Sequence, residues 1–289
     1  MHGAVRAGAY DDAMKIAAVQ MVSTPDVARN LEAAARGVAQ AAAAGATLVS
    51  LPEYFCLMGH SDRDKLARAE PGAAQGGGPI QRFLAETARA HKIWLLGGTL
   101  PVQVPGNADR VLNRHPVYAP DGSEVAHYDK IHLFAYDNGR ENYDEGRTLM
   151  AGSQPVAVQA GGLRVGLSIC YDLRFPELYR ALMSPPCDVL SVPAAFTHTT
   201  GRAHWELLLR ARAVENQCYV LAAAQGGTHE NGRRTWGHSM VVDPWGDVLD
   251  CVPEGEGVAI AEIDAARLAQ VRLQLPALKH RRLQGTVQD

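Results

Sequence analysis

The sequence has little cysteine and none of the cysteine pairs that bind zinc. Its 289 residues include five cysteines, which are odd in number, widely scattered and free of any C-x-x-C spacing. This pattern argues against a disulfide framework and against a zinc site, and it favours a reducing, cytoplasmic location. The eleven histidines form no H-E-x-x-H or comparable motif, so we expect no metal site.

A strong charge of either sign and a long apolar run are also missing. Lys and Arg total 28 and Asp and Glu total 31, which leaves a net charge of −3. This balance gives no reason to expect a nucleic-acid partner or an anionic membrane surface. No apolar stretch reaches the length of a membrane span. Residues 1–13 lack the hydrophobic segment of a secretory signal, and we expect them to form a disordered extension.

What the sequence does contain is a regular alternation of strand-like and helix-like segments. The apolar periodicity predicts helices over residues 27–44, 80–91, 204–216 and 265–273, with strands between them. No linker, low-complexity tract or repeat of fixed period interrupts this alternation. The predicted fold class is therefore α/β, as one domain of layered sheets covered by helices.

A cysteine at the end of an apolar run is the first candidate for chemistry. The strand-like run 165–169 leads directly into Cys170, and a helix-like segment over residues 176–183 follows. A strand that turns into a helix would hold this thiol at the rim of a sheet, with the N–H groups of the turn directed at it. That geometry suits a nucleophile. The local pattern also allows a buried structural cysteine.

Glu53 and Lys130 are the second and third candidates. The strand-like run 47–53 ends in Glu53, and apolar neighbours would raise the pKa of its carboxyl group and suit it to act as a general base. The alternative for Glu53 is a solvated loop acid. Lys130 lies where another strand gives way to a loop, and a buried lysine is unusual unless it is paired. Strand ends are where the sites of α/β sheets assemble.

The segments around these three residues resemble the nitrilase superfamily of carbon–nitrogen hydrolases. The matching segments are 51–53, 128–134 and 170–177. The resemblance extends over residues 14–283, which we expect to form a single hydrolase domain followed by a short tail at 284–289. It implies a four-layer α-β-β-α sandwich, a homodimer or higher homo-oligomer, and a Glu-Lys-Cys triad that needs no metal or organic cofactor.

The resemblance also implies a role for each side chain in the triad. Cys170 would attack an amide carbonyl as a thiolate of lowered pKa, and Glu53 would transfer the protons. The Lys130 ammonium and the Tyr171 backbone N–H would hold the oxyanion. A second glutamate of the family matches Glu145, which would orient Lys130 or the leaving group.

Other polar and aromatic residues are weaker candidates for the site. Arg174 would either meet a substrate carboxylate or form an intramolecular ion pair. Phe196 and Thr197 follow a strand end, where they would shape the pocket. His204 and His238 would line the pocket or, in the interpretation we favour, bind backbone carbonyls. For Cys56, close to Glu53 in the sequence, we favour a role in packing.

Three segments outside the triad narrow the resemblance to one branch of the superfamily. Residues 203–213, 216–220 and 237–246 resemble the deaminated-glutathione amidase branch more than the ω-amidase branch. The implied substrate is a small-molecule amide, deaminated glutathione, which is hydrolysed to 2-oxoglutarate and cysteinylglycine in metabolite repair. Because fold and triad do not fix the substrate, an ω-amidase acting on α-ketoglutaramate, a nitrilase and an N-carbamoyl hydrolase remain alternatives. A non-catalytic binding protein would not need all three triad residues.

Overall fold

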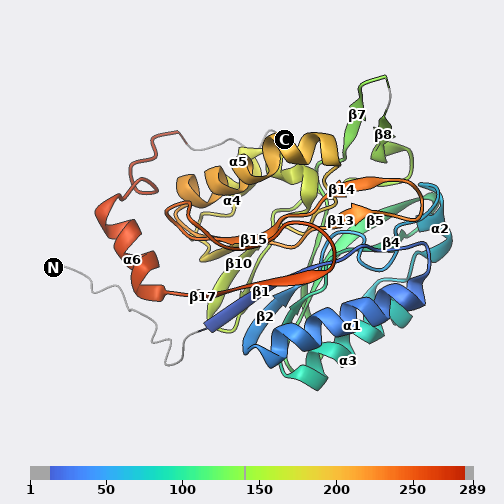
Figure 1. The fold of residues 1–289 in the computed structure, drawn as a ribbon, viewed down its shortest axis with the longest axis horizontal. Helices are drawn as coiled ribbons and strands as arrows, with labels where there is room; N and C mark the ends of the chain where they lie inside the picture. The colour runs from blue at the N-terminus through green and yellow to red at the C-terminus, as the bar shows by residue number, and fades with distance from the viewer. Residues whose placement is uncertain (1–13, 140, 284–289) are drawn as a thin grey trace.

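Two stacked β-sheets with helices on their outer faces make up the computed structural model, which describes residues 14–139 and 141–283. Helices α1 and α3 cover one sheet, and α4 and α5 cover the other (Figure 1). This is the predicted α-β-β-α sandwich. The expectations for residues 1–13 and for the tail at 284–289 lie outside the described residues.

The first sheet contains seven strands around a parallel centre. Its order is β17 (Gly257–Ile263), β1 (Met14–Gln20), β2 (Ala46–Ser50), β3 (Trp94–Leu96), β5 (Asn107–Tyr118) and β4 (Leu100–Val104), with β6 (Glu124–Asp129) also paired to β5. Strands β1, β2 and β3 run parallel, and the other pairs are antiparallel. The carboxyl ends of β2 and of its parallel neighbours therefore meet at one edge of the sheet.

The second sheet repeats this plan with six strands. Its order is β16 (Val248–Val252), β15 (Ser239–Val242), β12 (Tyr219–Ala222), β11 (Val189–Ser191), β10 (Leu163–Leu167) and β9 (Ala157–Ala160). Here β10, β11 and β12 are the parallel strands. Two small hairpins, β7 (Ala135–Asp137) with β8 (Asn142–Asp144) and β13 (Gly226–Thr228) with β14 (Arg234–Trp236), lie outside both sheets.

The helices form where a cap and an apolar face coincide. The bounds are α1 (Val27–Ala43), α2 (Asp64–Arg68), α3 (Pro79–His91), α4 (Pro176–Ala181), α5 (His198–Asn216) and α6 (Ala265–Gln274). The Asp26 side chain accepts the backbone N–H groups of Ala28 and Arg29 at the start of α1, which satisfies donors that have no partner within the helix. One face of α1, including Ala34 and Val38, packs on the first sheet.

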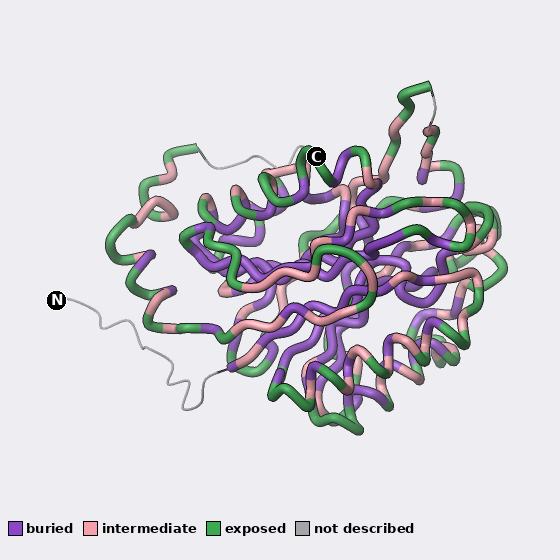
Figure 2. Tube along the Cα trace, viewed as in Figure 1, coloured by how far each residue is buried: buried purple, intermediate pink, exposed green. Residues whose placement is uncertain are grey.

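The largest part of the core lies between the two sheets. Ile16 and Leu48 of the first sheet are fully buried in one cluster with Val165, Val189 and Val220 of the second. Figure 2 shows the burial along the strands and the exposed outer faces of the helices. Within the described residues, no helix is both long enough and apolar enough to cross a membrane.

Most predicted elements are present, with differences at their ends. The helices predicted over 27–44 and 80–91 are correct to within a residue. The helix predicted from residue 204 begins earlier, at His198, because the Thr197 hydroxyl caps it by accepting the N–H of Thr200. The strands predicted to reach Glu53 and Cys170 end sooner, at Ser50 and Leu167.

Candidate active site

Glu53, Glu145 and Cys170 line one pocket, and buried Lys130 binds the two carboxylates from behind its wall. The Lys130 ammonium donates to Glu53 Oε1 at 2.9 Å and to Glu145 Oε2 at 2.7 Å. Cys170 lines the same pocket as both carboxylates. Glu53 and Lys130 follow strands of the first sheet, and Cys170 follows a strand of the second. The site therefore exists only where the two sheets meet.

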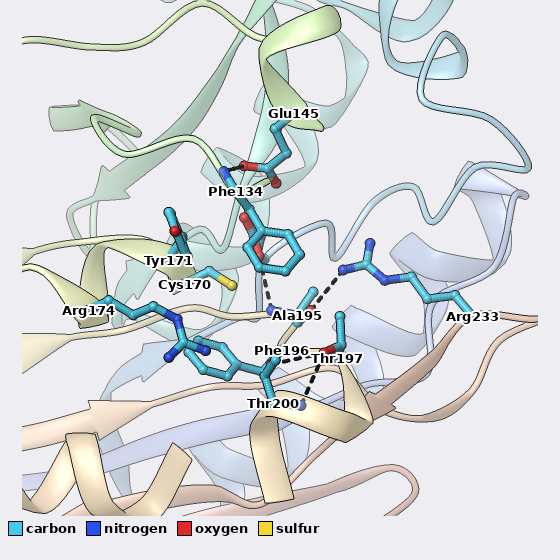
Figure 3. Close-up of a pocket in the computed structure, with 11 residues that line it drawn as sticks. Phe134, Glu145, Cys170, Tyr171, Arg174, Ala195, Phe196, Thr197, Thr200 and Arg233 are labelled. Carbon is cyan, nitrogen blue, oxygen red and sulfur yellow. Dashed lines mark hydrogen bonds between the residues drawn. The ribbon is translucent and has the colours of Figure 1, made fainter. Parts of the chain in front are cut away.

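Cys170 is placed by a tight turn. It is the first residue of a 3-10 helix, Cys170–Arg174, that precedes α4, and its N–H donates to the carbonyl of Pro193 at 2.9 Å. Its φ of 49° is in the left-handed region, which is uncommon for a residue with a side chain and is often found at functional sites. In Figure 3 its sulfur points into the pocket.

The expected low pKa of Cys170 is wrong for the protein without a ligand. Burial and the negative charge of Glu53 raise the pKa of this thiol well above its ordinary value, and the positive charge of Lys130 only partly offsets them. Glu145 also raises this pKa, so two carboxylates and burial act against the single positive charge of Lys130. The resting nucleophile is therefore a thiol.

Glu53 is held by three donors, which corrects the apolar environment predicted for it. The donors are Lys130 Nζ at 2.9 Å, Asn113 Nδ2 at 2.9 Å and the backbone N–H of Ala195 at 3.0 Å. Glu53 is buried in a turn, so it is not a solvated loop acid. Both of its oxygens are fixed within the pocket.

Lys130 and Glu145 form a buried ion pair that extends this network. Burial lowers the pKa of Lys130, but the charges of Glu145 and Glu53 outweigh burial and raise it above its ordinary value. Burial likewise raises the pKa of Glu145, and the charges of Lys130 and Lys65 outweigh it and lower the pKa. Glu145 also accepts the Tyr54 hydroxyl at 2.6 Å and the Phe134 N–H at 2.8 Å. Lys130 is thus a fixed cation.

All four predicted substrate-binding residues lie in the wall of the pocket, whose empty volume is about 270 Å³. They are Tyr171, Arg174, Phe196 and Thr197. The Arg174 guanidinium lies 5.3 Å from the ring centre of Phe196, and it donates to His204 Nδ1 at 3.2 Å. No carboxylate pairs with Arg174 among residues 14–139 and 141–283. Within that part of the chain, the intramolecular ion pair that the sequence also allowed for Arg174 is not formed.

The histidines and Cys56 have structural surroundings. His238 Nδ1 lies 3.0 Å from the carbonyl oxygen of Trp236, the type of contact predicted for it. His204 contacts Arg174 instead of a backbone carbonyl. Cys56 is buried with its sulfur 3.7 Å from the carbonyl oxygen of Thr99, as expected for packing. Where the structure is described, no cluster of three or more His, Cys, Asp or Glu side chains could hold a metal ion.

The sequence interpretation missed several residues of the site. Asn113 binds Glu53 from within β5, and Tyr54 binds Glu145. A polar residue that is buried in a strand is a usable signal, but the sequence does not reveal which positions are buried. Arg233 also lines the pocket, although its surroundings in the sequence, between Gly232 and Thr235, look like an ordinary surface turn. Ala195 contributes through its backbone, which carries no signal in the residue type.

Comparison with known proteins agrees with this geometry. A family model described as carbon–nitrogen hydrolase matches residues 15–273. The chain belongs to the carbon–nitrogen hydrolase family. Members of this family hydrolyse carbon–nitrogen bonds other than peptide bonds, so the chain is a hydrolase of that class. The predicted resemblance to the nitrilase superfamily is confirmed.

Individual hydrolases of this family are similar over nearly the whole chain. A Synechocystis protein named deaminated glutathione amidase is 46% identical over 268 residues, which is 92% of this chain and 97% of the relative. A solved Saccharomyces cerevisiae member of branch 10 of the nitrilase superfamily is 32% identical, with a TM-score of 0.85 over 94% of this chain and 97% of that one.

A third relative carries direct chemical information about its own site. It is an amidase from Nesterenkonia, 27% identical with a TM-score of 0.74, over 91% of this chain and 98% of that chain. The solved structure is that of a mutant of this amidase, and it shows the result of Michael addition of acrylamide at the active-site cysteine. The fold predicted from the sequence is confirmed by these neighbours.

Proposed function

We propose that this carbon–nitrogen hydrolase is an amidase that cleaves deaminated glutathione to 2-oxoglutarate and cysteinylglycine through a thioester on Cys170. The observation that carries the proposal is the Lys130 ammonium, which bridges two buried carboxylates in the pocket that the thiol enters. Relatives that bear the name of this activity support the choice of substrate.

In the acylation step, Glu53 accepts the thiol proton while the sulfur attacks the amide carbonyl. Because burial and Glu53 raise the pKa of this thiol, its attack requires a base that takes the proton. The carbonyl oxygen gains the negative charge, and the Lys130 ammonium and the Tyr171 backbone N–H stabilise it. The loss of one such donor typically costs about a hundredfold or more in rate. Glu145 acts as a positioning residue that holds Lys130.

In the second half of the reaction, Glu53 returns the proton to the leaving nitrogen. The carbon–nitrogen bond breaks, cysteinylglycine departs as an amine, and the acyl group remains on Cys170 as a thioester. Glu53 then removes a proton from water, which attacks the thioester. The carbon–sulfur bond breaks, and 2-oxoglutarate leaves as the thiol regains its proton. The protein's own residues suffice for every proton transfer, and the proposal includes no metal or organic cofactor.

Arg174 is the proposed partner of the 2-oxo acid carboxylate in the acyl half of the substrate. Its guanidinium has no acidic partner within the described chain and lies beside Tyr171 and Phe196. Phe196 and Thr197 would enclose the acyl chain. The same contacts suit α-ketoglutaramate, the substrate of ω-amidases, because it carries the same acyl group and releases ammonia.

The proposal is tested by turnover of both amides with the purified protein. We expect deaminated glutathione to have the higher kcat/KM, and we expect Cys170→Ala to lose activity on both substrates by more than about a thousandfold. A mass adduct of the 2-oxoglutaryl group should appear on Cys170 in the unmodified protein and be absent from the variant. Full amidase activity of Cys170→Ala would falsify the nucleophile assignment. No turnover of any amide would favour a binding protein on this scaffold.

We further propose that the chain acts as a homodimer or higher homo-oligomer in the cytoplasm, with residues 14–283 as one hydrolase domain. Two large apolar side chains, Leu207 in α5 and Trp245, are exposed. Arg210 of α5 donates to the carbonyl of Gly246, next to Trp245, so the turn of Trp245 lies beside α5. These exposed side chains support an interface that includes α5. All five cysteines are free, which supports a reducing compartment. Sedimentation of the protein should give twice the monomer mass or more, and Leu207→Glu should reduce it.

A further inference from the structure

Arg233 lies in the pocket wall without an acidic partner. It precedes β14 and lines the same pocket as Cys170 and Glu53. No carboxylate lies within ion-pair distance of it in the described residues, whereas the neighbouring Arg234 pairs with Glu254 at the surface. A guanidinium is always charged and seldom lies at the wall of a narrow pocket without an anion.

The hydrogen bonds of Arg233 leave most of its donors unused. Nη2 donates to the carbonyl of Ala195 at 2.9 Å, and Nη1 reaches only the sulfur of Met58, at 3.9 Å. Nε is buried and has no partner. The guanidinium carbon lies 5.2 Å from the ring centre of Tyr143. A guanidinium has five N–H donors, so this group is held in place while retaining donors for an oxygen ligand.

The two carboxylates of the pocket do not neutralise the positive charge of Arg233. Glu53 and Glu145 both bind Lys130, and Glu145 also accepts from Tyr54 and Phe134. Each is fixed by contacts that do not include Arg233. With no carboxylate within ion-pair distance among the described residues, the charge of Arg233 is open to an anionic group of the ligand.

The position of Arg233 relative to Glu53 indicates which half of the substrate it meets. Ala195 joins the two residues: its N–H donates to Glu53 at 3.0 Å, and its carbonyl accepts from Arg233 at 2.9 Å. In the proposed mechanism Glu53 protonates the leaving nitrogen, so the leaving amine lies on this side. Figure 3 shows Arg174 and Arg233 on opposite sides of the pocket, with the Cys170 sulfur between them.

We propose that Arg233 binds a carboxylate at the far end of the leaving amine and thereby selects amides that release a carboxylate-bearing amine over amides that release ammonia. This inference rests on the proposed amidase function. A dipeptide leaving group reaches about 7 Å when extended, and its terminal carboxylate matches the fork of a guanidinium. Arg174 and Arg233 together would hold a substrate that is anionic on both sides of the scissile bond.

The test compares two substrates that differ in one charge. Deaminated glutathione carries a terminal carboxylate, and its glycinamide analogue carries a neutral amide at the same place. We expect the unmodified protein to prefer the carboxylate by about 10- to 100-fold in kcat/KM, mainly through KM, because hydrogen bonds to charged groups contribute more than neutral ones. Arg233→Gln should reduce this preference to within about threefold, and Arg233→Lys should retain part of it.

The matched control is Arg234→Gln, which removes an exposed arginine next to Arg233 and should leave the preference unchanged. α-Ketoglutaramate is the reference substrate, because its leaving group is ammonia: the loss of kcat/KM in Arg233→Gln should be at least about tenfold larger on deaminated glutathione than on α-ketoglutaramate. A preference that persists in Arg233→Gln would overturn the inference, as would an equal loss on all three substrates. If the unmodified protein hydrolyses none of them, the proposed function itself fails, and that result is distinguishable from both.

Discussion

At the scale of single residues, the main finding is that the nucleophile is a thiol at rest. Cys170 lies among two carboxylates and one lysine, and its pKa is raised by burial and then by Glu53. A cysteine paired with a free cation would instead have a lowered pKa. The difference favours a mechanism in which the base acts at the moment of attack, when the substrate carbonyl lies beside Glu53 and Lys130.

A raised pKa predicts slow alkylation of Cys170 by iodoacetamide at neutral pH. The thiolate fraction is small at pH 7 to 8, so the rate should be at least about tenfold below that of free cysteine at pH 8. The rate should still be rising with pH above 9, because deprotonation of this thiol is incomplete there. Peptide mass spectrometry after timed quenching measures the rate at Cys170 alone.

Cys170→Ser is the control for this alkylation experiment, because it removes the reacting sulfur and keeps a side chain of similar size. The peptide that contains position 170 should then gain no label. An alkylation rate at Cys170 that reaches its maximum near pH 7 would mean that the effect of Lys130 on the pKa of the thiol outweighs the effects of burial and Glu53. The thiolate would then exist before substrate binds.

At the scale of elements, one buried carboxylate connects the turn of Cys170 to the segment of Lys130. Asp172 accepts the N–H of Ile169, the residue that precedes its 3-10 helix, at 2.8 Å. It also accepts the Tyr128 hydroxyl at 2.8 Å and the His132 N–H at 3.0 Å, on either side of Lys130. Asp172 therefore fixes the position of Cys170 relative to Lys130, although it does not line the pocket.

Asp172→Ala is expected to lower both kcat and stability. Four groups would lose their partner, namely the Ile169 N–H, the Tyr128 hydroxyl, the His132 N–H and His132 Nδ1, which lies 2.7 Å from the carboxylate. This loss should cost about 2–4 kcal/mol in the free energy of unfolding. We expect kcat to fall by about tenfold or more and KM to rise as well, because the turn that shifts carries Cys170 together with Tyr171 and Arg174 of the pocket wall. Urea unfolding and initial rates measure the two effects.

Asp172→Asn keeps one oxygen acceptor and should give intermediate values. Asp109→Ala changes an exposed aspartate in β5 and should leave the unfolding free energy within about 0.5 kcal/mol. A wild-type kcat in Asp172→Ala would show that the turn keeps its geometry without this carboxylate.

The elements also indicate which features the sequence could reveal. Alternating apolar runs and caps such as Asp26 are local signals, and they predicted α1 and α3 closely. The three residues Glu53, Lys130 and Cys170 could be identified because each follows a strand-like run and matches a family motif. Arg233 could not, because its importance depends on Ala195, Met58 and Tyr143, which are distant in the sequence. The raised pKa of Cys170 likewise depends on burial that only the packed sheets create.

At the scale of the whole molecule, the site is a product of packing between the sheets. Glu53 follows β2 and Lys130 follows β6 in the first sheet, whereas Cys170 follows β10 and Ala195 follows β11 in the second. The hydrogen bond from the Ala195 N–H to Glu53 crosses from one sheet to the other. The core between the sheets and the catalytic geometry should therefore be lost together on unfolding.

Leu48→Ala tests this coupling between core and site. Leu48 in β2 is 0% exposed and lies in the cluster shared by both sheets, so its truncation should lower the free energy of unfolding by about 3–5 kcal/mol. Leu273→Ala, at an 81% exposed position in α6, should change it by less than about 0.5 kcal/mol. In urea, amidase activity and tryptophan fluorescence should be lost at the same midpoint in each protein. Activity lost well before fluorescence would mean that the sheets separate at the site while each keeps its own structure.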